Sequence, residues 1–459
     1  MSTAQSKQRW TLALASVASL MMALDLLVVS TALSTIRSEL EVSVVALQWT
    51  VTGYGLSFAS LLLTGAALGD RFGRRRMFVV GLGLFVASSA CCALSTTVEA
   101  LIAARVVQGA GAALTIPVAL ALVSAAYPSQ TRGKAIGILE GVTGLATIAG
   151  PILGGGVAGG IAWEWIFWIN VPIGVLAMIF AFTRVDESFG SDTALDLPGI
   201  GLVSAGALGL VWGAVRGNTV GWGALEVLGS LTAGVLLLAA FVAWEVRTDE
   251  PMLPMVFFGS RAFSAPVAAS FFLFAALYGS VFFLAQFMQT GLGYEPLEAG
   301  LLLVPWTATL IVVAPLAGAL GDRVGERSLV VGGLALNAAG LGALALIADP
   351  GSPYWELLVP LLVTGIGASA AIPVVQTALI GAVAPSDVGK ASGVNNMVQE
   401  LGGVFGIAAL VAVFSATGGY ASAEAFSGGF TQAIGGCAAL AVAGAVAGAV
   451  LPRGANRHN

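Results

Sequence analysis

The chain has 459 residues, of which 58% are hydrophobic and 9% are charged, with a formal net charge of −5 and a mean hydropathy of +0.94. Because a soluble domain has a charged fraction of about 25%, this composition excludes a soluble protein and favours one that lies in a lipid bilayer. Most acidic residues flank the apolar runs, and the sequence contains no basic surface of the kind that binds nucleic acid.

Fourteen long apolar runs alternate with polar segments along the chain. A helix needs about 20 apolar residues to cross the ~30 Å hydrocarbon core of a membrane. Each run therefore predicts one membrane-spanning helix. The predicted spans are residues 11–33, 48–69, 77–97, 100–123, 135–159, 165–183, 199–215, 225–246, 263–290, 299–320, 329–347, 355–380, 391–416 and 430–451.

The positions of lysine and arginine predict the orientation. Loops on the cytoplasmic side of a membrane retain these residues, and an even number of spans places both termini on one side. If that side is the cytoplasm, all 19 lysine and arginine residues fall at the cytoplasmic face except Arg37, Arg105 and Arg216. We therefore expect a multi-pass protein of the plasma membrane with both termini in the cytoplasm.

A charged motif between the second and third predicted spans occurs twice. Residues 67–75 (ALGDRFGRR) return as residues 319–327 (ALGDRVGER), with seven identical residues out of nine at an offset of 252. Three matches at an offset of 256 extend the repeat: Gly109 with Gly365, Gly111 with Gly367, and Gly133 with Gly389. The two halves of the chain therefore share one plan of helices.

The repeat predicts the domain organisation. We expect an N-terminal six-helix bundle at residues 1–183, a linker with two additional membrane spans at 184–254, and a C-terminal six-helix bundle at 255–459. The two spans of the linker have no counterpart in the repeat. The predicted fold is an all-α polytopic membrane protein in which a pseudo-twofold axis relates the two bundles, with 14 transmembrane helices in total.

Ionisable residues inside the predicted spans are functional candidates, because a charge in hydrocarbon costs several kcal/mol unless it has a partner or faces a cavity. Asp25 and Arg105 both lie roughly 8–12 Å below the outer ends of their helices at ~1.5 Å per residue, so their side chains can meet. Asp25 is then either a structural polar clamp or a proton or substrate site. Glu400 and Glu140 are the second and third candidates for a proton carrier. The one histidine, His458, lies in the C-terminal tail, so the carrier must be a carboxylate.

Uncharged polar residues within the spans predict a cavity for a substrate. They are Gln108, Gln286, Gln289, Asn395, Asn396 and Gln399. The three cysteines offer neither the spacing of a metal site nor a disulfide framework, and we expect them to pack in the core. We expect no metal and no cofactor.

These motifs together resemble the major facilitator superfamily, and specifically its branch of drug:proton antiporters with fourteen spans. Residues 65–76 resemble the family signature between the second and third helices, 101–111 resemble the fourth-helix motif, and 163–174 (WEWIFWINVPIG) are also similar to this branch. The motif of the fifth helix in exporters of this family is matched by Gly144, Gly150, Pro151, Gly154 and Gly155. The resemblance covers nearly the whole chain.

The repeated motif has an expected mechanical role as a latch between the two halves. Asp70 lies at the end of its predicted helix and can accept hydrogen bonds at the positive N-terminus of another helix, which the repeat identifies as the one that starts near Lys390. Asp322 would do the same near Lys134. The residues that we expect to form the latch are Gly69, Asp70, Arg71, Gly73, Arg74, Asp322 and Arg323.

The resemblance implies a proton-coupled secondary transporter that exports small hydrophobic or cationic compounds, including antibiotics, by alternating access. Export of a lipid, an amino acid or another metabolite stays open, and so does a receptor or scaffold that transports nothing. An ATP-driven pump is disfavoured because the chain lacks a Gly-x4-Gly-Lys-Ser/Thr loop. We expect no enzymatic activity, a monomer, and no partners beyond a small-molecule substrate, protons and the bilayer.

Overall fold

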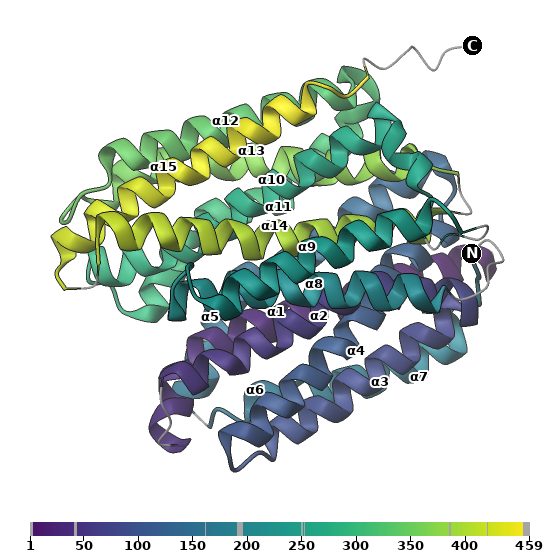
Figure 1. Cartoon of the computed structure of the whole chain (residues 1–459), viewed down its shortest axis with the longest axis horizontal. Coiled ribbons are helices and arrows are strands. Elements are labelled where there is room, and N and C mark those ends of the chain that lie inside the picture. The colour runs from purple at the N-terminus through teal and green to yellow at the C-terminus, as the bar shows by residue number, and fades with distance from the viewer. Residues whose placement is uncertain are drawn as a thin grey trace. The chain divides into compact units, whose positions relative to one another are not determined.

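The computed structural model describes residues 3–40, 44–160, 162–190, 196–248, 251, 253–384, 387–419 and 421–452, and for parts of some helices it describes the backbone alone. Every regular element in these ranges is a helix (Figure 1). The prediction of an all-α polytopic membrane protein is confirmed.

The helices follow one another along the chain with short connections. They are α1 (Thr3–Leu40), α2 (Val44–Phe72), α3 (Arg74–Ala93), α4 (Val98–Ala126), α5 (Ser129–Gly160), α6 (Trp165–Trp168), α7 (Asn170–Arg184), α8 (Leu197–Val220), α9 (Leu225–Glu245), η1 (Met255–Gly259), α10 (Arg261–Gln286), η2 (Phe287–Gly291), α11 (Pro296–Val324), α12 (Glu326–Ile347), α13 (Tyr354–Gly381), α14 (Val388–Thr417) and α15 (Ala423–Gly448).

Among the described residues, 13 helices are long and apolar enough to cross a membrane. The remaining predicted span, residues 135–159, lies within α5, which is 32 residues long. Long apolar runs fold as helices because hydrocarbon offers no water to the backbone, so each N–H and C=O group must bond within its own segment.

Two predicted spans are not single α-helices. The span predicted at 165–183 begins as the four-residue helix α6 and continues as α7, with Ile169 between them. The span predicted at 263–290 ends in the π-helical turn η2, where the N–H of Leu292 donates to the carbonyl of Phe287 at 2.9 Å. These departures matter for function because π turns and interrupted helices re-aim the side chains that follow them.

Two compact units divide the chain. The first consists of Met1–Trp212, Ser230–Met255 and Ala384–Met397, and the second of Gly213–Gly229, Val256–Val383 and Val398–Asn459. The first turns of α14 therefore belong to the first unit and the rest of α14 to the second. The domain boundaries expected at residues 183 and 254 stay a prediction.

In the first unit, α4 packs between α2 and α3 (Figure 1). Glycines make this approach possible. A Cβ atom on Gly65 of α2 would lie 2.8 Å from the carbonyl carbon of Ala113, and one on Gly111 of α4 would lie 2.6 Å from the Phe85 amide nitrogen and 2.9 Å from the Gly81 carbonyl oxygen. Because no Cβ atom fits at these distances, the backbones of the three helices are in direct contact.

The second unit repeats this packing between α12 and α13. A Cβ atom on Gly367 of α13 would overlap the amide nitrogen of Asn337 and would lie 2.5 Å from the carbonyl oxygen of Gly333. These three residues stand at offsets of 256, 252 and 252 from their counterparts in the first unit. The offsets are those of the sequence repeat.

A second pair of contacts follows the same rule. Gly109 of α4 packs on the Tyr54 carbonyl of α2, and Gly365 of α13 packs on the Trp306 carbonyl of α11 at the corresponding positions. The internal duplication therefore extends from sequence motifs to the contacts between individual backbone atoms.

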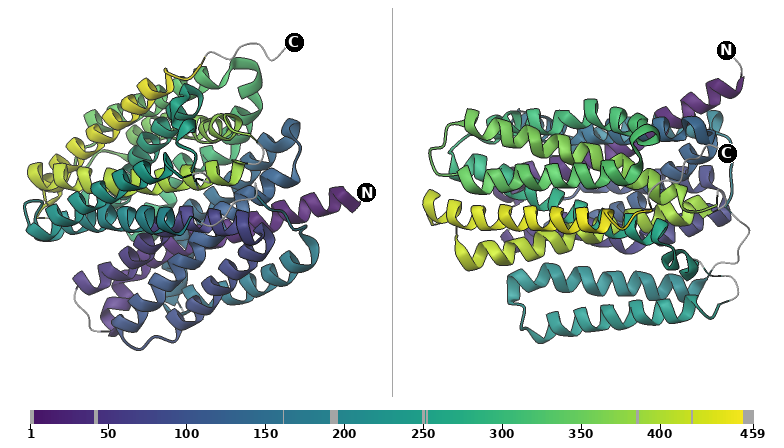
Figure 2. Two further views of the ribbon diagram at one scale, coloured as in Figure 1. Left: turned by 45° about the vertical axis from the view of Figure 1, so that its right-hand side comes forward. Right: turned by 90° about the horizontal axis from the view of Figure 1, so that it is seen from above.

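The two additional spans, α8 and α9, lie side by side as a helical hairpin (Figure 2). Their contact also uses small residues. A Cβ atom on Gly206 would lie 2.8 Å from the Leu238 side chain, one on Gly209 would lie 2.9 Å from the Ser230 carbonyl oxygen, and one on Gly234 would lie 2.8 Å from the Leu210 amide nitrogen.

We expect Gly367→Ala to destabilise the protein by about 1–3 kcal/mol, the usual cost of overpacking a core, because the added methyl group meets backbone atoms of α12 that cannot move aside. Gly332→Ala is the matched control, since no atom lies within 4 Å of a Cβ at that position. Thermal unfolding of the purified variants in detergent measures both. Equal midpoints for the two variants would contradict the contact.

Candidate functional site

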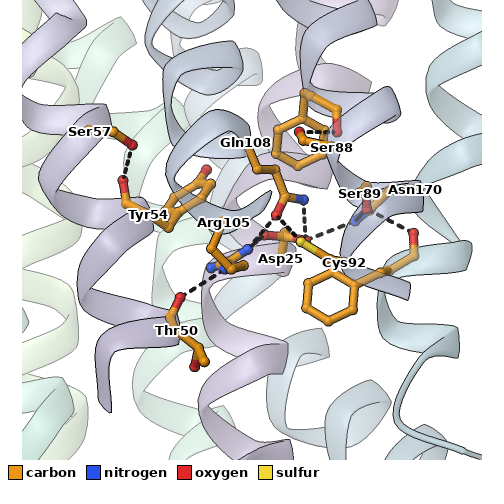
Figure 3. Close-up of polar contacts among 12 residues, drawn as sticks. Asp25, Thr50, Tyr54, Ser57, Ser88, Ser89, Cys92, Arg105, Gln108 and Asn170 are labelled. Carbon is orange, nitrogen blue, oxygen red and sulfur yellow. Dashed lines mark hydrogen bonds and ion pairs between the residues drawn. The ribbon is translucent and has the colours of Figure 1, made fainter. Parts of the chain in front are cut away.

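A buried ion pair joins α1 to α4 in the first unit (Figure 3). The side chain of Asp25 lies on α1 and that of Arg105 on α4, and the two residues are 2% and 0% exposed. Arg105 donates from Nη1 to Oδ2 of Asp25. The prediction that the two side chains can meet is confirmed.

Two amide side chains complete the surroundings of the Asp25 carboxylate. Gln108 donates from Nε2 to Oδ1 of Asp25 at 2.9 Å, and Asn170 donates from Nδ2 to the same oxygen at 2.9 Å. The amide oxygen of Gln108 in turn accepts a hydrogen bond from Nη1 of Arg105 at 2.7 Å. Three donors from α4 and α7 thus hold one carboxylate, and we call Asp25, Arg105, Gln108 and Asn170 the Asp25 cluster.

Local sequence explains why these side chains converge. Arg105 and Gln108 are three residues apart on α4, a spacing that places both on one face of a helix. Asn170 is the first residue of α7, directly after the break at Ile169. Its Nδ2 atom also lies 3.1 Å from Oγ of Ser89 on α3, so α3 helps to orient the amide.

The guanidinium group of Arg105 has further partners. Its Nε atom donates to the carbonyl of Thr50 at 3.0 Å, and its central carbon lies 4.3 Å from the ring centre of Tyr54 and 5.8 Å from that of Phe167. An aromatic face stabilises a desolvated cation by about 2 kcal/mol. Nη2 of Arg105 has no hydrogen-bond partner among the described residues. This amino group of the guanidinium can therefore still donate a hydrogen bond.

Chemically, the Asp25 cluster is a carboxylate whose charge is balanced by one cation and whose lone pairs are held by neutral amides. If Arg105 moved away, Gln108 and Asn170 would still bond to the carboxylate but could not neutralise it. A proton would then be the remaining source of positive charge. Among the described contacts, the Arg105 guanidinium is therefore the group that neutralises this carboxylate.

The structure places the predicted polar residues in different surroundings. Gln108, expected in a substrate cavity, is fully buried within the Asp25 cluster. In the second unit, Glu400 accepts a hydrogen bond from the Tyr278 hydroxyl at 3.3 Å. Gln286 donates to the Phe282 carbonyl of its own helix at 3.1 Å, and Gln289 is exposed.

The remaining candidates lie on α14 and α5. On α14, Asn395 and Gln399 are buried and Asn396 is half-buried. On α5, Gly144 and Gly150 lie within the helix. The other predicted residues of α5 are outside those whose side chains the structure describes: Glu140, Pro151, Gly154 and Gly155.

Asn170 is the functional candidate that the sequence reasoning missed. It stood inside residues 163–174, which served only to support the family resemblance. Its signal was an amide side chain within a predicted span, the same feature that selected Gln108. Tyr54 and Ser89 gave no such signal, because aromatic and small hydroxyl residues are common in transmembrane helices.

The signature turn, which we define as residues 69–76, joins α2 to α3. Gly69 packs against α4, where a Cβ atom would lie 2.5 Å from the Val118 side chain. Gly73 has a φ of +103°, a backbone conformation that glycine adopts without strain. Arg71 is exposed. The glycines of the motif therefore have conformational and packing roles of their own.

Asp70 is buried at this turn between two glycines. The Arg74 side chain donates from Nε to Oδ1 of Asp70 at 2.8 Å. A Cβ atom on Gly389, in the first turn of α14, would lie 2.5 Å from Oδ1 of Asp70, and one on Gly190 would lie 2.5 Å from its carboxyl carbon. The carboxylate therefore lies at the N-terminus of α14, where the sequence predicted it.

One detail of that prediction is wrong. Among the described residues, the hydrogen bonds to the Asp70 carboxylate come from Arg74 rather than from N–H groups of α14. Lys390, at the same helix start, donates instead to the carbonyl of Pro251 at 3.1 Å. The second predicted latch, at Asp322 and Arg323, falls on side chains outside the described part of the chain.

The segment that follows α7 lies on the signature turn, which the sequence did not predict. The N–H of Arg74 donates to the carbonyl of Ser188 at 2.8 Å, and the N–H of Arg75 donates to Oε1 of Glu187 at 2.8 Å. Oε2 of Glu187 also lies 3.6 Å from Nε of Arg75. The linker between the first six spans and the hairpin is thus anchored to the start of α3.

We expect Arg105→Met to destabilise the protein by about 3–5 kcal/mol, because it leaves the Asp25 charge buried without a partner. Adding Asp25→Asn should recover most of this loss, since the neutral amide needs no cation. Thermal unfolding of the single and double variants measures the difference. A double variant no more stable than Arg105→Met would show that the ion pair does not control stability here.

Comparisons with known proteins agree on the family. A profile of the Major Facilitator Superfamily matches residues 15–280 and 266–457. Among solved structures, the human organic anion transporter MFSD10 (TETRAN) superposes with a TM-score of 0.70 at 15% identity, covering 96% of this chain and 99% of that chain. At that identity the likeness establishes the fold alone.

Several curated relatives are bacterial resistance proteins. The tetracenomycin C resistance and export protein of Streptomyces glaucescens is 37% identical over 404 residues, which cover 87% of this chain and 74% of that protein. The lincomycin resistance protein of Streptomyces lincolnensis is 35% identical over 417 residues, 89% and 85% of the two chains. The methylenomycin A resistance protein of Bacillus subtilis is 32% identical over 392 residues, 85% and 84%. The chain belongs to the Major Facilitator Superfamily, and it is a multi-pass membrane transporter rather than an enzyme.

Proposed function

We propose that this transporter exports small hydrophobic or cationic compounds, antibiotics among them, in exchange for protons. The relatives named for tetracenomycin C, lincomycin and methylenomycin A support an antibiotic cargo. The observation that carries the proposal is the buried Asp25 cluster, because ionisable residues inside transmembrane segments are costly and rare and mark proton or substrate pathways.

The proton step uses the balance of charge between Asp25 and Arg105. While Asp25 is ionised, the guanidinium and the carboxylate neutralise each other. Protonation of Asp25 removes the anion and leaves a buried cation without a partner, which is strongly unfavourable. Such a state favours any conformation in which Arg105 reaches water or a new acceptor. Proton binding is thereby converted into a bias on conformation.

The conformational step is alternating access. We place the cytoplasmic latch at Asp70, whose carboxylate lies against Gly389 at the N-terminus of α14. A carboxylate at a helix N-terminus contributes typically 0.3–1 kcal/mol, and up to about 2 kcal/mol when partly buried. An interaction of this size can be made and broken in each transport cycle.

The direction of transport follows from the proposed location. We place the protein in the plasma membrane with both termini in the cytoplasm, as the distribution of lysine and arginine favours. Protons then enter down their gradient and the compound leaves. We propose a monomer as the working unit, because each of the two halves of the repeat lies in the same chain.

Asp25→Asn should abolish export driven by a pH gradient and permit downhill exchange of the compound, since the amide cannot load or release a proton. Both modes are measured in proteoliposomes, with the antibiotics of the named relatives as the compound panel. Retained exchange also reports that the variant is folded. Asp349→Asn is the control, as Asp349 is exposed in a turn. Uphill transport by Asp25→Asn would transfer the role to Glu400.

Asp70→Asn and Gly389→Ala should each slow transport by about tenfold, the effect of ~1.4 kcal/mol on a barrier, and leave binding of the compound unchanged. The first removes the charge at the helix N-terminus, and the second pushes a methyl group into the carboxylate. Gly332→Ala serves as the control. Transport rates in proteoliposomes and binding by fluorescence decide the matter, and normal rates for both variants would remove the latch from the mechanism.

A further inference from the structure

A second pair of buried carboxyl groups lies in the hairpin of the additional helices. Asp196 directly precedes α8, and Glu245 is the last residue of α9. Their residues are 8% and 2% exposed. The two groups meet beside Gly199, where a Cβ atom would lie 2.7 Å from the carboxyl carbon of Asp196 and 2.9 Å from Oε1 of Glu245. Neither residue takes part in the Asp25 cluster or in the repeat.

One oxygen of each carboxyl group has donors. Oδ1 of Asp196 accepts hydrogen bonds from the N–H of Gly199 at 2.9 Å and from Nε1 of Trp244 at 2.8 Å. Oε2 of Glu245 accepts one from the N–H of Leu253 at 3.0 Å. These bonds join the start of α8, the end of α9 and the segment that leads to the second unit.

The other two oxygens have no such donor. Oδ2 of Asp196 and Oε1 of Glu245 are buried, and no N–H or hydroxyl group of the described residues bonds to either. Both atoms border the space beside Gly199 that a Cβ atom would fill, so the two carboxyl groups lie next to each other. Buried polar atoms in native proteins have partners with few exceptions, and each of these oxygens has the other carboxyl group beside it.

The electrostatics of the two carboxyl groups also indicate a shared proton. Two carboxylates that share one buried site cannot both be ionised without a large cost. The charged side chain that acts on Glu245 from another element is Lys390 of α14, and its ammonium group donates to the Pro251 carbonyl at 3.1 Å. Among the described residues neither carboxylate has an ion pair. One lysine charge can offset at most one of the two negative charges, and the second needs another source of positive charge.

We propose that Asp196 and Glu245 form a second proton-binding site, in which one proton shared between the two carboxyl groups fastens the start of α8 to the end of α9 and to Leu253. With the proton present, one carboxyl donates to the other and both orphaned oxygens are satisfied. With the proton lost, two anions face each other in a buried site. The site does not depend on proton exchange at Asp25.

A shared proton makes the stability of the folded protein depend on pH in one direction. The folded protein holds a proton that separate carboxyl groups in the unfolded chain release, so stability falls as pH rises through the range in which the pair loses it. Glu245→Gln imitates the protonated state permanently, because its amide N–H donates to Oδ2 of Asp196. This variant should therefore be stable and should lose that part of the pH dependence.

Infrared spectroscopy of the purified full chain in lipid nanodiscs tests the shared proton directly. The absorption of protonated carboxyl groups at neutral pH should fall by the intensity of one group in Glu245→Gln and by the same intensity in Asp196→Asn, since each amide donates to the remaining carboxylate. The double variant should lose no more than either single variant. The proposal would be overturned if the double variant lost the sum of the two single-variant intensities, or if the spectrum of either single variant were unchanged.

Thermal unfolding against pH gives an independent readout. The midpoint of the wild-type protein should fall between mildly acidic and alkaline pH, and that fall should be reduced in Glu245→Gln. Glu226→Gln is the matched control on the same helix, because the Glu226 side chain is 46% exposed and pairs with Arg216. An unreduced slope in Glu245→Gln, or a midpoint that follows added sodium or magnesium instead of pH, would overturn the proposal. In an Asp25→Asn background, Glu245→Gln should reduce the slope by the same amount as it does in the wild-type protein, which separates this site from the proposed transport mechanism.

Discussion

A carboxylate can lie in the middle of a membrane only if its charge has a partner and its lone pairs have donors. Asp25 meets both conditions with residues from α4 and α7, and Ser89 of α3 steadies one of the amides. The arrangement of helices in the first unit follows from this requirement. The interruption at Ile169 sets Asn170 at the first position of α7, from which its amide bonds to the carboxylate.

The two copies of the internal repeat share their helix-packing glycines but differ in their polar residues. Glycines at equivalent positions of α4 and α13 bring backbones together in the same way in both units. The chemistry differs. At the offset of 256, Arg105 corresponds to Leu361, which lies in an apolar cluster, and Gln108 corresponds to Thr364. At these positions one copy of the shared architecture therefore carries charged and amide side chains, and the other carries an apolar residue and a hydroxyl.

The features that depend on position along one helix could be predicted from the sequence. Hydrophobic length predicted the spans, and depth in the membrane predicted that Asp25 and Arg105 meet. Features that depend on the rotation of a helix about its axis, or on the path of a linker, could not be predicted in this way. Depth alone could not show that Gln108 faces Asp25 rather than a cavity. Nothing local indicated that Glu187 would bond to the signature turn, because that contact joins segments more than a hundred residues apart.

The same limit applies to the carboxyl pair of the hairpin. Asp196 stood among several acidic residues of a polar linker, and such residues are usually solvated. Its burial depends on Trp244 and Glu245, which return to it from the far end of the next helix. A hairpin that brings its two ends together makes a buried site from residues that look like ordinary loop and helix-end positions.

The position of Asp70 between Gly190 and Gly389 also constrains how this chain can evolve. Each glycine lies against the same carboxylate, although one belongs to the linker after α7 and the other to the first turn of α14. A larger residue at either position requires Asp70 to move, and a moved Asp70 changes what fits at the other. Three positions scattered along the sequence are therefore coupled by packing, so a chimaera whose new linker or α14 carries a larger residue at either glycine position displaces Asp70.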